Sequence, residues 1–166
     1  MSQKAEVPVD TIHKRIPYRL LSPNDIDGLV VCAADPRYQK AFRNFIEQDL
    51  GMQNPVVLAI PGGIGELVSP GAVKNARRLA DQLKLLVKDA RVNRIILINH
   101  ADNQALHKLL GMWTSVLRIP VDKDLSIHVL ELAEKLVEKY LGVSVECYLA
   151  KAEEDGTIQF FRLDHQ

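Results

Sequence analysis

Three short runs of apolar residues, each followed directly by turn residues, most strongly constrain the fold of this chain. They are Leu29–Ala34, Pro55–Ile60 and Arg94–Asn99. A strand that is buried on both faces carries a continuous apolar run, and such strands are typical of parallel sheets. Segments with helical spacing of apolar residues separate the three runs. The pattern predicts an α/β fold in which helices cover both faces of a mostly parallel sheet.

The segments between the strands are predicted to be helices. Pro36 suits the first turn of one helix, with Asp35 as its N-cap and Gly51 as its end. Further helices are expected from Ser69-Pro70 to about Lys88, over 103–113, and from Asp122 or Asp124 to Gly142. The last of these helices is predicted to bury a stripe formed by Leu125, Val129, Leu132, Leu136 and Tyr140.

The C-terminal part of the chain reads as a hairpin. Val143–Ala150 is predicted to be a fourth strand, and Asp155-Gly156 is a turn signal before a strand over Thr157–Leu163. We therefore expect about four parallel strands and an antiparallel edge strand. Residues 1–27 are polar with scattered prolines and are predicted to form an N-terminal arm, with a short helix near 9–14. Residues 28–166 are predicted to form a single domain.

Composition excludes several classes of partner. The chain has 166 residues, 21 Lys and Arg against 21 Asp and Glu, and a pI of about 7.0. Nucleic acids and anionic membranes require a positive surface, so neither is expected as a partner. No apolar run approaches the roughly 18 residues that span a bilayer, and the N-terminus has no apolar signal core. We expect a cytoplasmic protein whose Cys32 and Cys147 are buried thiols.

Polar residues follow each of the three apolar runs. Asp35 and Arg37 follow the first, Gly62 and Gly63 the second, and His100 the third. In open α/β sheets, ligands bind outside the carboxyl ends of the strands. These residues are therefore candidates for one binding crevice. The alternatives remain a capping role for Asp35, a turn role for the two glycines rather than an anion-binding nest, and a structural role for His100 at the edge of the core.

Taken together, these motifs resemble the β-class carbonic anhydrases. In that family the first strand ends in Cys-x-Asp-x-Arg, the second in a glycine-containing turn, and the third in His-x-x-Cys. Asp35-Pro36-Arg37 matches the Asp-x-Arg part, Pro61-Gly62-Gly63 the turn, and His100 the histidine. The resemblance covers about 28–110 in motifs and the rest in element order. It implies a zinc held by two cysteines and the histidine, with Asp35 and Arg37 orienting the metal-bound water as catalytic residues.

The sequence departs from the family at the metal positions. Ala33 and Asn103 stand where the resemblance implies cysteines, so His100 is the retained zinc ligand. One imidazole is too few, because catalytic zinc sites use three protein ligands. A rebuilt site could use Asp35, as closed-form members of the family do, Asp102, or Cys32. Cys32 needs a bulge to reach the face of Ala33. We expect no cofactor, with zinc as the less favoured alternative.

Three functions remain open at this point. The favoured one is a repurposed or non-catalytic carbonic-anhydrase-like protein that binds a small anion or polar metabolite through Asp35, Arg37, Gly62, Gly63, His100 and Asn103. The second is a structural subunit, because the resemblance implies a homodimer or higher homo-oligomer. The third is a zinc enzyme that hydrates carbon dioxide. The fold alone does not choose among them.

Overall fold

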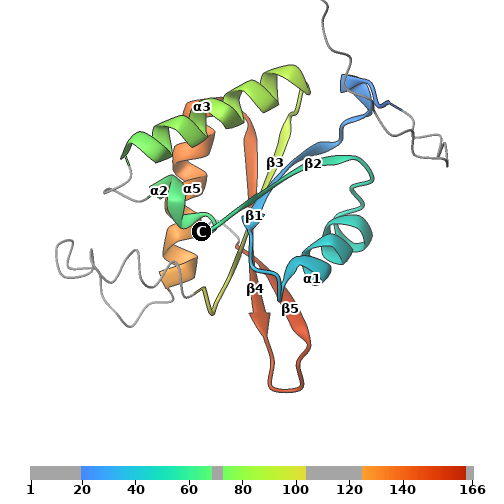
Figure 1. Ribbon diagram of the computed structural model, residues 1–166, viewed down its shortest axis with the longest axis vertical. Coiled ribbons are helices and arrows are strands. Elements are labelled where there is room, and N and C mark those ends of the chain that lie inside the picture. Colours follow the sequence, from blue (N-terminus) through green and yellow to red (C-terminus); the bar gives the residue numbers. More distant parts are fainter. Residues whose placement is uncertain (1–19, 69–72, 104–124, 164–166) are drawn as a thin grey trace, which may run out of the picture.

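The computed structural model describes residues 20–68, 73–103 and 125–163, which form one five-stranded sheet (Figure 1). The strands are β1 (Gly28–Ala33), β2 (Pro55–Ile60), β3 (Arg94–His100), β4 (Ser144–Ala152) and β5 (Ile158–Arg162). Their order across the sheet is β2-β1-β3-β4-β5. Strands β1 to β4 are mutually parallel, and β5 pairs antiparallel to β4. The predicted α/β class with an antiparallel edge strand is confirmed.

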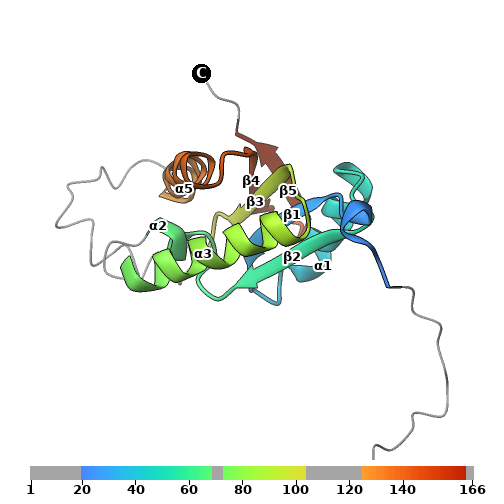
Figure 2. The same cartoon turned by 90° about the horizontal axis from the view of Figure 1, so that it is seen from above.

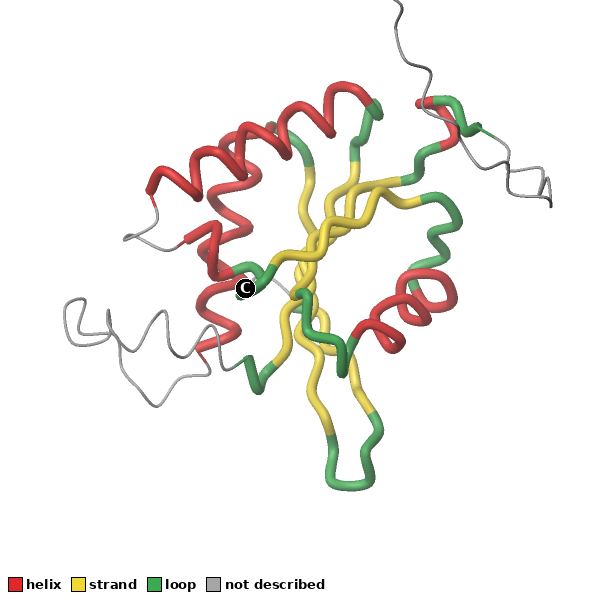
Figure 3. The backbone as a smooth tube through the Cα atoms, viewed as in Figure 1, coloured by secondary structure: helices red, strands yellow, loops and turns green. Residues whose placement is uncertain are grey.

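Helices lie on both faces of the sheet, as predicted (Figures 2 and 3). Helix α1 (Gln39–Asn44) and the π-helical turn η2 (Phe45–Asp49) cover one face. Helices α2 (Gly65–Val68), α3 (Val73–Asp89) and α5 (Leu125–Leu141) cover the other. The central strands of the sheet are therefore buried on both sides, which is why β1 and β3 are continuous apolar runs.

Side chains of β1 and β3 alternate between two apolar clusters. Leu29, Val31, Ile95 and Leu97 face α2, α3 and α5. The intervening residues face α1 and η2, where Phe42, Phe45 and Ile46 pack on them: Val30, Cys32, Ile96 and Ile98. The register of β1 with both neighbours is continuous, so no bulge interrupts the alternation. The faces of the residues at the strand ends follow from this regularity.

Two local predictions are wrong. The first concerns the segment after β1, where helix α1 begins at Gln39 rather than at Pro36. Residues 36–38 form a turn, which the bond from the Tyr38 N–H to the Asp35 carbonyl closes at 3.1 Å. Asp35 does not cap the helix. Its side chain accepts the N–H of Arg37 instead, at 2.9 Å.

The second wrong prediction concerns the buried stripe of α5. Leu132, Leu136 and Tyr140 are 39%, 50% and 46% exposed. Ser126 and Glu134 are buried in their place, alongside Val129, Leu130, Ala133 and Val137. Helix α5 carries apolar residues around much of its circumference, and its contacts with the sheet, α2 and α3 select the face that is buried.

The N-terminal part of the described chain is tied to the sheet. A 3-10 turn, η1 (Pro23–Asp25), precedes β1, and the Asp27 carboxylate accepts the backbone N–H groups of Gln53 and Asn54 before β2. The rest of the expected arm and its helix near 9–14, the helix over 103–113, and the helix starts at Ser69-Pro70 and Asp122 lie outside the described residues. None of the helices in the described ranges is long and apolar enough to cross a membrane.

Candidate functional site

The sheet order creates a switch point between its two central strands. The chain moves from β1 to β2 on one side and returns to β3 on the other side of β1. At such a point the loops leave the carboxyl ends of neighbouring strands in opposite directions and open a crevice. Asp35 follows β1 here, and His100 ends β3. The structure thus places the predicted site residues at the end of the sheet where ligands bind in this class of fold.

Asp35 and Arg37 form a local fork. The carboxylate oxygens of Asp35 accept the Arg37 Nε at 3.1 and 3.2 Å and the Arg37 Nη2 at 2.7 Å. The side-chain amide of Gln39 fastens the same turn by donating to the carbonyl oxygens of Ala33 and Asp35, at 2.7 and 3.2 Å. The planar guanidinium of Arg37 is therefore held on one side by residues of its own turn.

Asp102 joins the two strand ends. Its Oδ2 accepts Arg37 Nη1 at 2.8 Å, and its Oδ1 accepts the Tyr38 hydroxyl at 2.6 Å. The same Oδ1 lies 2.8 Å from His100 Nδ1. We call Asp35, Arg37, Tyr38, His100 and Asp102 the ionic cluster. Asp102 is its centre, since it contacts residues from both sides of the switch point.

His100 is almost completely enclosed, with 2% of its surface exposed. Its ring stacks on Tyr38 with centroids 4.4 Å apart. While Nδ1 faces Asp102, Nε2 lies 3.7 Å from Asp35 Oδ2. Both ring nitrogens of His100 therefore face carboxylates.

The charges of the ionic cluster favour the ionised form of both acids. The hydrogen bond from Arg37 is the main cause that holds the pKa of Asp35 below its usual value. Partial burial raises the pKa of Asp102, but the bonds from Tyr38 and His100 and the charge of Arg37 outweigh it and bring that pKa to about 2. Burial, followed by the bond to Asp102, raises the pKa of Tyr38. At neutral pH both carboxylates are ionised and the phenol is neutral.

A second group of side chains meets on the opposite side of the strand ends. Gly63 has a φ of 68°, and a Cβ on it would lie 3.0 Å from Asn103 Nδ2, 3.1 Å from the Ala33 methyl and 3.3 Å from Asn99 Oδ1. Asn103 Nδ2 donates to Asn99 Oδ1 at 3.0 Å and approaches the Gly62 carbonyl at 3.4 Å. We call Ala33, Gly63, Asn99 and Asn103 the amide group.

Strand alternation explains why the two groups are separate. Asn99 and His100 are neighbours in β3, so their side chains leave opposite faces of the sheet. Asn99 faces Gly63, whereas His100 stacks on Tyr38 next to α1. Cys32 alternates with Ala33 in the same way and packs in the cluster that contains Tyr38. Burial raises the pKa of the Cys32 thiol to about 11, so it stays protonated at neutral pH.

Comparison with solved structures places this architecture among known folds. A β-carbonic anhydrase, isoform I, from the protozoan Trichomonas vaginalis superposes with a TM-score of 0.51 at 15% sequence identity, covering 87% of this chain and 85% of that one. The chain has a β-carbonic-anhydrase-like fold. The β-carbonic anhydrase of the fungal pathogen Aspergillus fumigatus aligns with a TM-score of 0.45 at 14% identity, over 84% of this chain and 75% of that one. No family model and no curated protein matches the sequence.

The residues present at the strand ends do not fit the zinc that β-class carbonic anhydrases hold. The expected thiolate positions carry a methyl group at Ala33 and an amide nitrogen at Asn103 that is bonded to Asn99. His100 has carboxylates beside both ring nitrogens. Within the described ranges, no group of three or more histidine, cysteine, aspartate or glutamate side chains is arranged to hold a metal ion. The residues at the two expected thiolate positions therefore supply no zinc ligand.

The structure divides the predicted site residues between two places. Asp35, Arg37 and His100 come together in the ionic cluster, whereas Gly63 and Asn103 belong to the amide group. The Gly63 N–H already donates to the Ile60 carbonyl at 2.9 Å. Two sets of contacts therefore replace the single crevice that the sequence predicts.

Two members of the ionic cluster carried little or no signal in the sequence. The sequence indicates Asp102 only as a candidate metal ligand, and it does not distinguish Tyr38 from other aromatic residues. The spacing His100-x-Asp102 at a strand end was the available signal for the carboxylate. Tyr38 looked like an ordinary aromatic residue near the start of a helix.

Proposed function

We propose that this chain is a carbonic-anhydrase-like protein that binds a small oxyanion at Arg37 and works without a catalytic zinc. The main support for this proposal is that the Arg37 side chain is held in position and is exposed. Two carboxylates from different loops fix it, yet 56% of the side chain is exposed. A cation that is both fixed in position and open to solvent is suited to binding a ligand.

The donors of Arg37 define what can bind. A guanidinium has five N–H groups. Asp35 takes the one on Nε and one on Nη2, and Asp102 takes one on Nη1. One N–H therefore remains on each of the two terminal nitrogens. Two donors in one plane match two oxygens of a planar anion such as bicarbonate or a carboxylate.

Charge limits the class of ligand further. Asp35, Asp102 and Arg37 together carry one net negative charge. An anion with a single charge is the least repelled by such a site, whereas phosphate, with its higher charge, is disfavoured. Asp35, Tyr38 and Asp102 act in this proposal as positioning residues for Arg37 and His100.

The non-catalytic part of the proposal rests on Ala33 and Asn103. Hydration of carbon dioxide by zinc requires a metal that lowers the pKa of a bound water, which depends on a complete set of protein ligands. A methyl group and a hydrogen-bonded amide supply none of these at the two positions.

Binding of bicarbonate, acetate and phosphate can be measured by calorimetry and by NMR titration near pH 6.5. We expect Arg37→Ala to weaken bicarbonate binding about ten-fold, which corresponds to the loss of a charged hydrogen-bonding group. Arg37→Lys should restore little of it, because an ammonium cannot present two coplanar donors. Arg43→Ala, an exposed arginine of α1, is the matched control. Equal affinity in all four proteins would refute the anion site.

A separate experiment tests whether the protein holds zinc. Protein purified without chelators is analysed for metal content, and carbon dioxide hydration is measured with and without added zinc. We expect far less than one zinc per chain and a hydration rate at background. Stoichiometric zinc with hydration activity that Asp35→Asn abolishes would establish an enzyme instead.

The assembly is the last part of the proposal. The resemblance of the sequence motifs to β-class carbonic anhydrases implies a homodimer or a higher homo-oligomer, which light scattering on the full-length protein would measure directly. A monomer at all concentrations would contradict it and would leave the anion site unaffected.

A further inference from the structure

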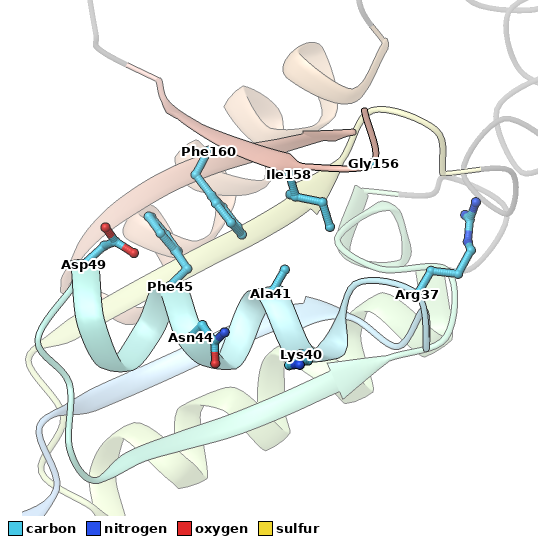
Figure 4. A pocket seen from close by; sticks show the side chains of 9 residues that line it. All are labelled: Arg37, Lys40, Ala41, Asn44, Phe45, Asp49, Gly156, Ile158 and Phe160. Carbon is cyan, nitrogen blue, oxygen red and sulfur yellow. The ribbon is translucent and has the colours of Figure 1, made fainter. Parts of the chain in front are cut away.

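A groove separate from the amide group runs between helix α1 and the edge strand β5 (Figure 4). Its volume is about 590 Å³, and its floor is formed by Ala41 and Phe45 on one side and Ile158 and Phe160 on the other. The rings of Phe45 and Phe160 stack with centroids 3.9 Å apart, which fixes the spacing between helix and strand. Packed side chains of the fold therefore define the groove.

The outer edge of β5 is unpaired within the described part of the chain. The Leu163 N–H donates to Cys147 and the Thr157 carbonyl accepts from Glu153, so the odd-numbered residues of β5 face β4. By alternation, the N–H and C=O groups of Ile158, Phe160 and Arg162 point away from the sheet. Ile158 and Phe160 also line the groove, so the free edge of β5 borders it.

We propose that this groove binds an extended peptide segment with an acidic C-terminal end, which adds to β5 as an antiparallel sixth strand. An edge strand beside a helix supplies both requirements of strand addition, namely free backbone groups for affinity and a groove for alternate side chains. Ile158–Phe161 contains no charged residue, and Arg162 is the single charged residue of β5, so most of this edge lacks the charges that usually block such pairing.

The charges at the two ends of the groove set the direction of the peptide. Lys40 and Arg37 lie toward the Gly156 end and Asp49 toward the other (Figure 4). No ion pair in the described ranges includes Lys40 or Asp49. A strand antiparallel to β5 ends near Lys40, where a carboxylate is favoured, and begins near Asp49, where a basic group is favoured.

The same charges disfavour a second copy of this chain in the groove. Pairing of two β5 strands in antiparallel orientation would bring the Arg162 of a second copy to the end of the groove that holds Lys40 and Arg37. Like charges at an interface oppose such pairing. A separate acidic peptide meets no such repulsion, and this difference selects it as the occupant.

The test uses a displayed library of random peptides with free C-termini against the full-length protein, followed by fluorescein-labelled copies of the enriched peptides. We expect enriched peptides with alternating apolar residues and an acidic end. Ala41→Trp, which fills the groove, should abolish their binding. Lys40→Glu should weaken it roughly five-fold, the range of an exposed ion pair. Lys151→Glu, an exposed lysine of β4, is the matched control and should change nothing.

A second readout keeps the test decisive if Ala41→Trp does not fold. Binding of a labelled peptide to the unmodified protein should slow hydrogen exchange at the amides of Ile158 and Phe160, because they become donors to the added strand. No enrichment over an unrelated protein, or binding that leaves those amides unprotected, would overturn the proposal. So would self-association that occupies the groove. None of the variants alters Arg37, so failure here is distinguishable from failure of the anion site.

Discussion

The ionic cluster and the amide group lie at the ends of the same two strands but differ in charge and exposure. The ionic cluster contains two carboxylates, a guanidinium and an imidazole, and both Arg37 and Asp102 are about half exposed. The amide group is neutral, and Ala33, Asn99 and Asn103 have 2%, 0% and 3% of their surface exposed. One group can meet a ligand, whereas the other is filled by protein.

This difference predicts that substitutions in the two groups have different effects. On the Gly63 side, small and hydrogen-bonded side chains pack together, so substitutions there should change stability. On the Arg37 side, the charges balance one another close to solvent, so substitutions should change binding and pH response more than stability. The predictions below test this division from the largest effect to the smallest.

Gly63→Ala should give the largest loss of stability. The residue has a φ of 68°, and the new methyl group would lie 3.0 Å from Asn103 Nδ2 and 3.1 Å from the Ala33 methyl. Left-handed backbone strain and overpacking together should lower the free energy of unfolding by about 2–4 kcal/mol. Gly51→Ala is the control, because its φ is 66° and nothing lies within 4 Å. Urea denaturation measures both, and equal losses would show that the amide group is not tightly packed.

Asn103→Ala should have an intermediate effect. It removes the donor to Asn99 Oδ1 in a buried position, where Asn99 Nδ2 already has no partner among the described residues. Leaving a buried polar atom unsatisfied costs about 1–3 kcal/mol. Asn44→Ala, at an exposed position of α1, should change the unfolding free energy by less than about 0.5 kcal/mol. A loss below that of Asn44→Ala would contradict a structural role for the amide pair.

Asp102→Asn should have the smallest effect on stability of the three substitutions. This effect should depend on pH. The folded-state pKa of Asp102 is about 2, below the value of 3.8 for an unperturbed aspartate. Its stabilising contribution is therefore complete above pH 3.8 and is lost as the pH falls through about 2. Since the side chain is half exposed, we expect a difference of about 1 kcal/mol or less at pH 6. Acid denaturation curves of the two proteins should converge near pH 2, and a constant offset would refute the prediction.

The sequence was sufficient to locate the sheet. The run Arg94–Asn99 lies within β3, because a strand enclosed between helices has apolar residues at nearly every position. The same logic failed on α5, where Leu136 is exposed and Glu134 is buried. Apolar residues surround much of that helix, and only its contacts with the sheet, α2 and α3 decide which of them become core.

The sequence predicted three residues of the ionic cluster but not the arrangement of the cluster. Strand ends indicated Asp35, Arg37 and His100 as neighbours, since parallel strands bring their carboxyl ends together. The separation of Asn103 from His100 depends on the alternation of Asn99 and His100 across the sheet. The central role of Asp102 depends on contacts with Arg37 and Tyr38, which are 65 and 64 residues away in the chain. A local sequence pattern cannot indicate contacts between residues that are so far apart in the chain.

These long separations also determine when the ionic cluster can form. The bond between Arg37 and Asp102 closes a loop of 65 residues, and it requires β3 to be paired with β1. Long-range contacts form late in folding, because the entropy of the closed loop is lost before many contacts compensate for it. The β4–β5 hairpin, by contrast, closes over a few residues and can form early. The two carboxylates therefore hold Arg37 only in a nearly complete fold, so a partly synthesised chain lacks the proposed anion site.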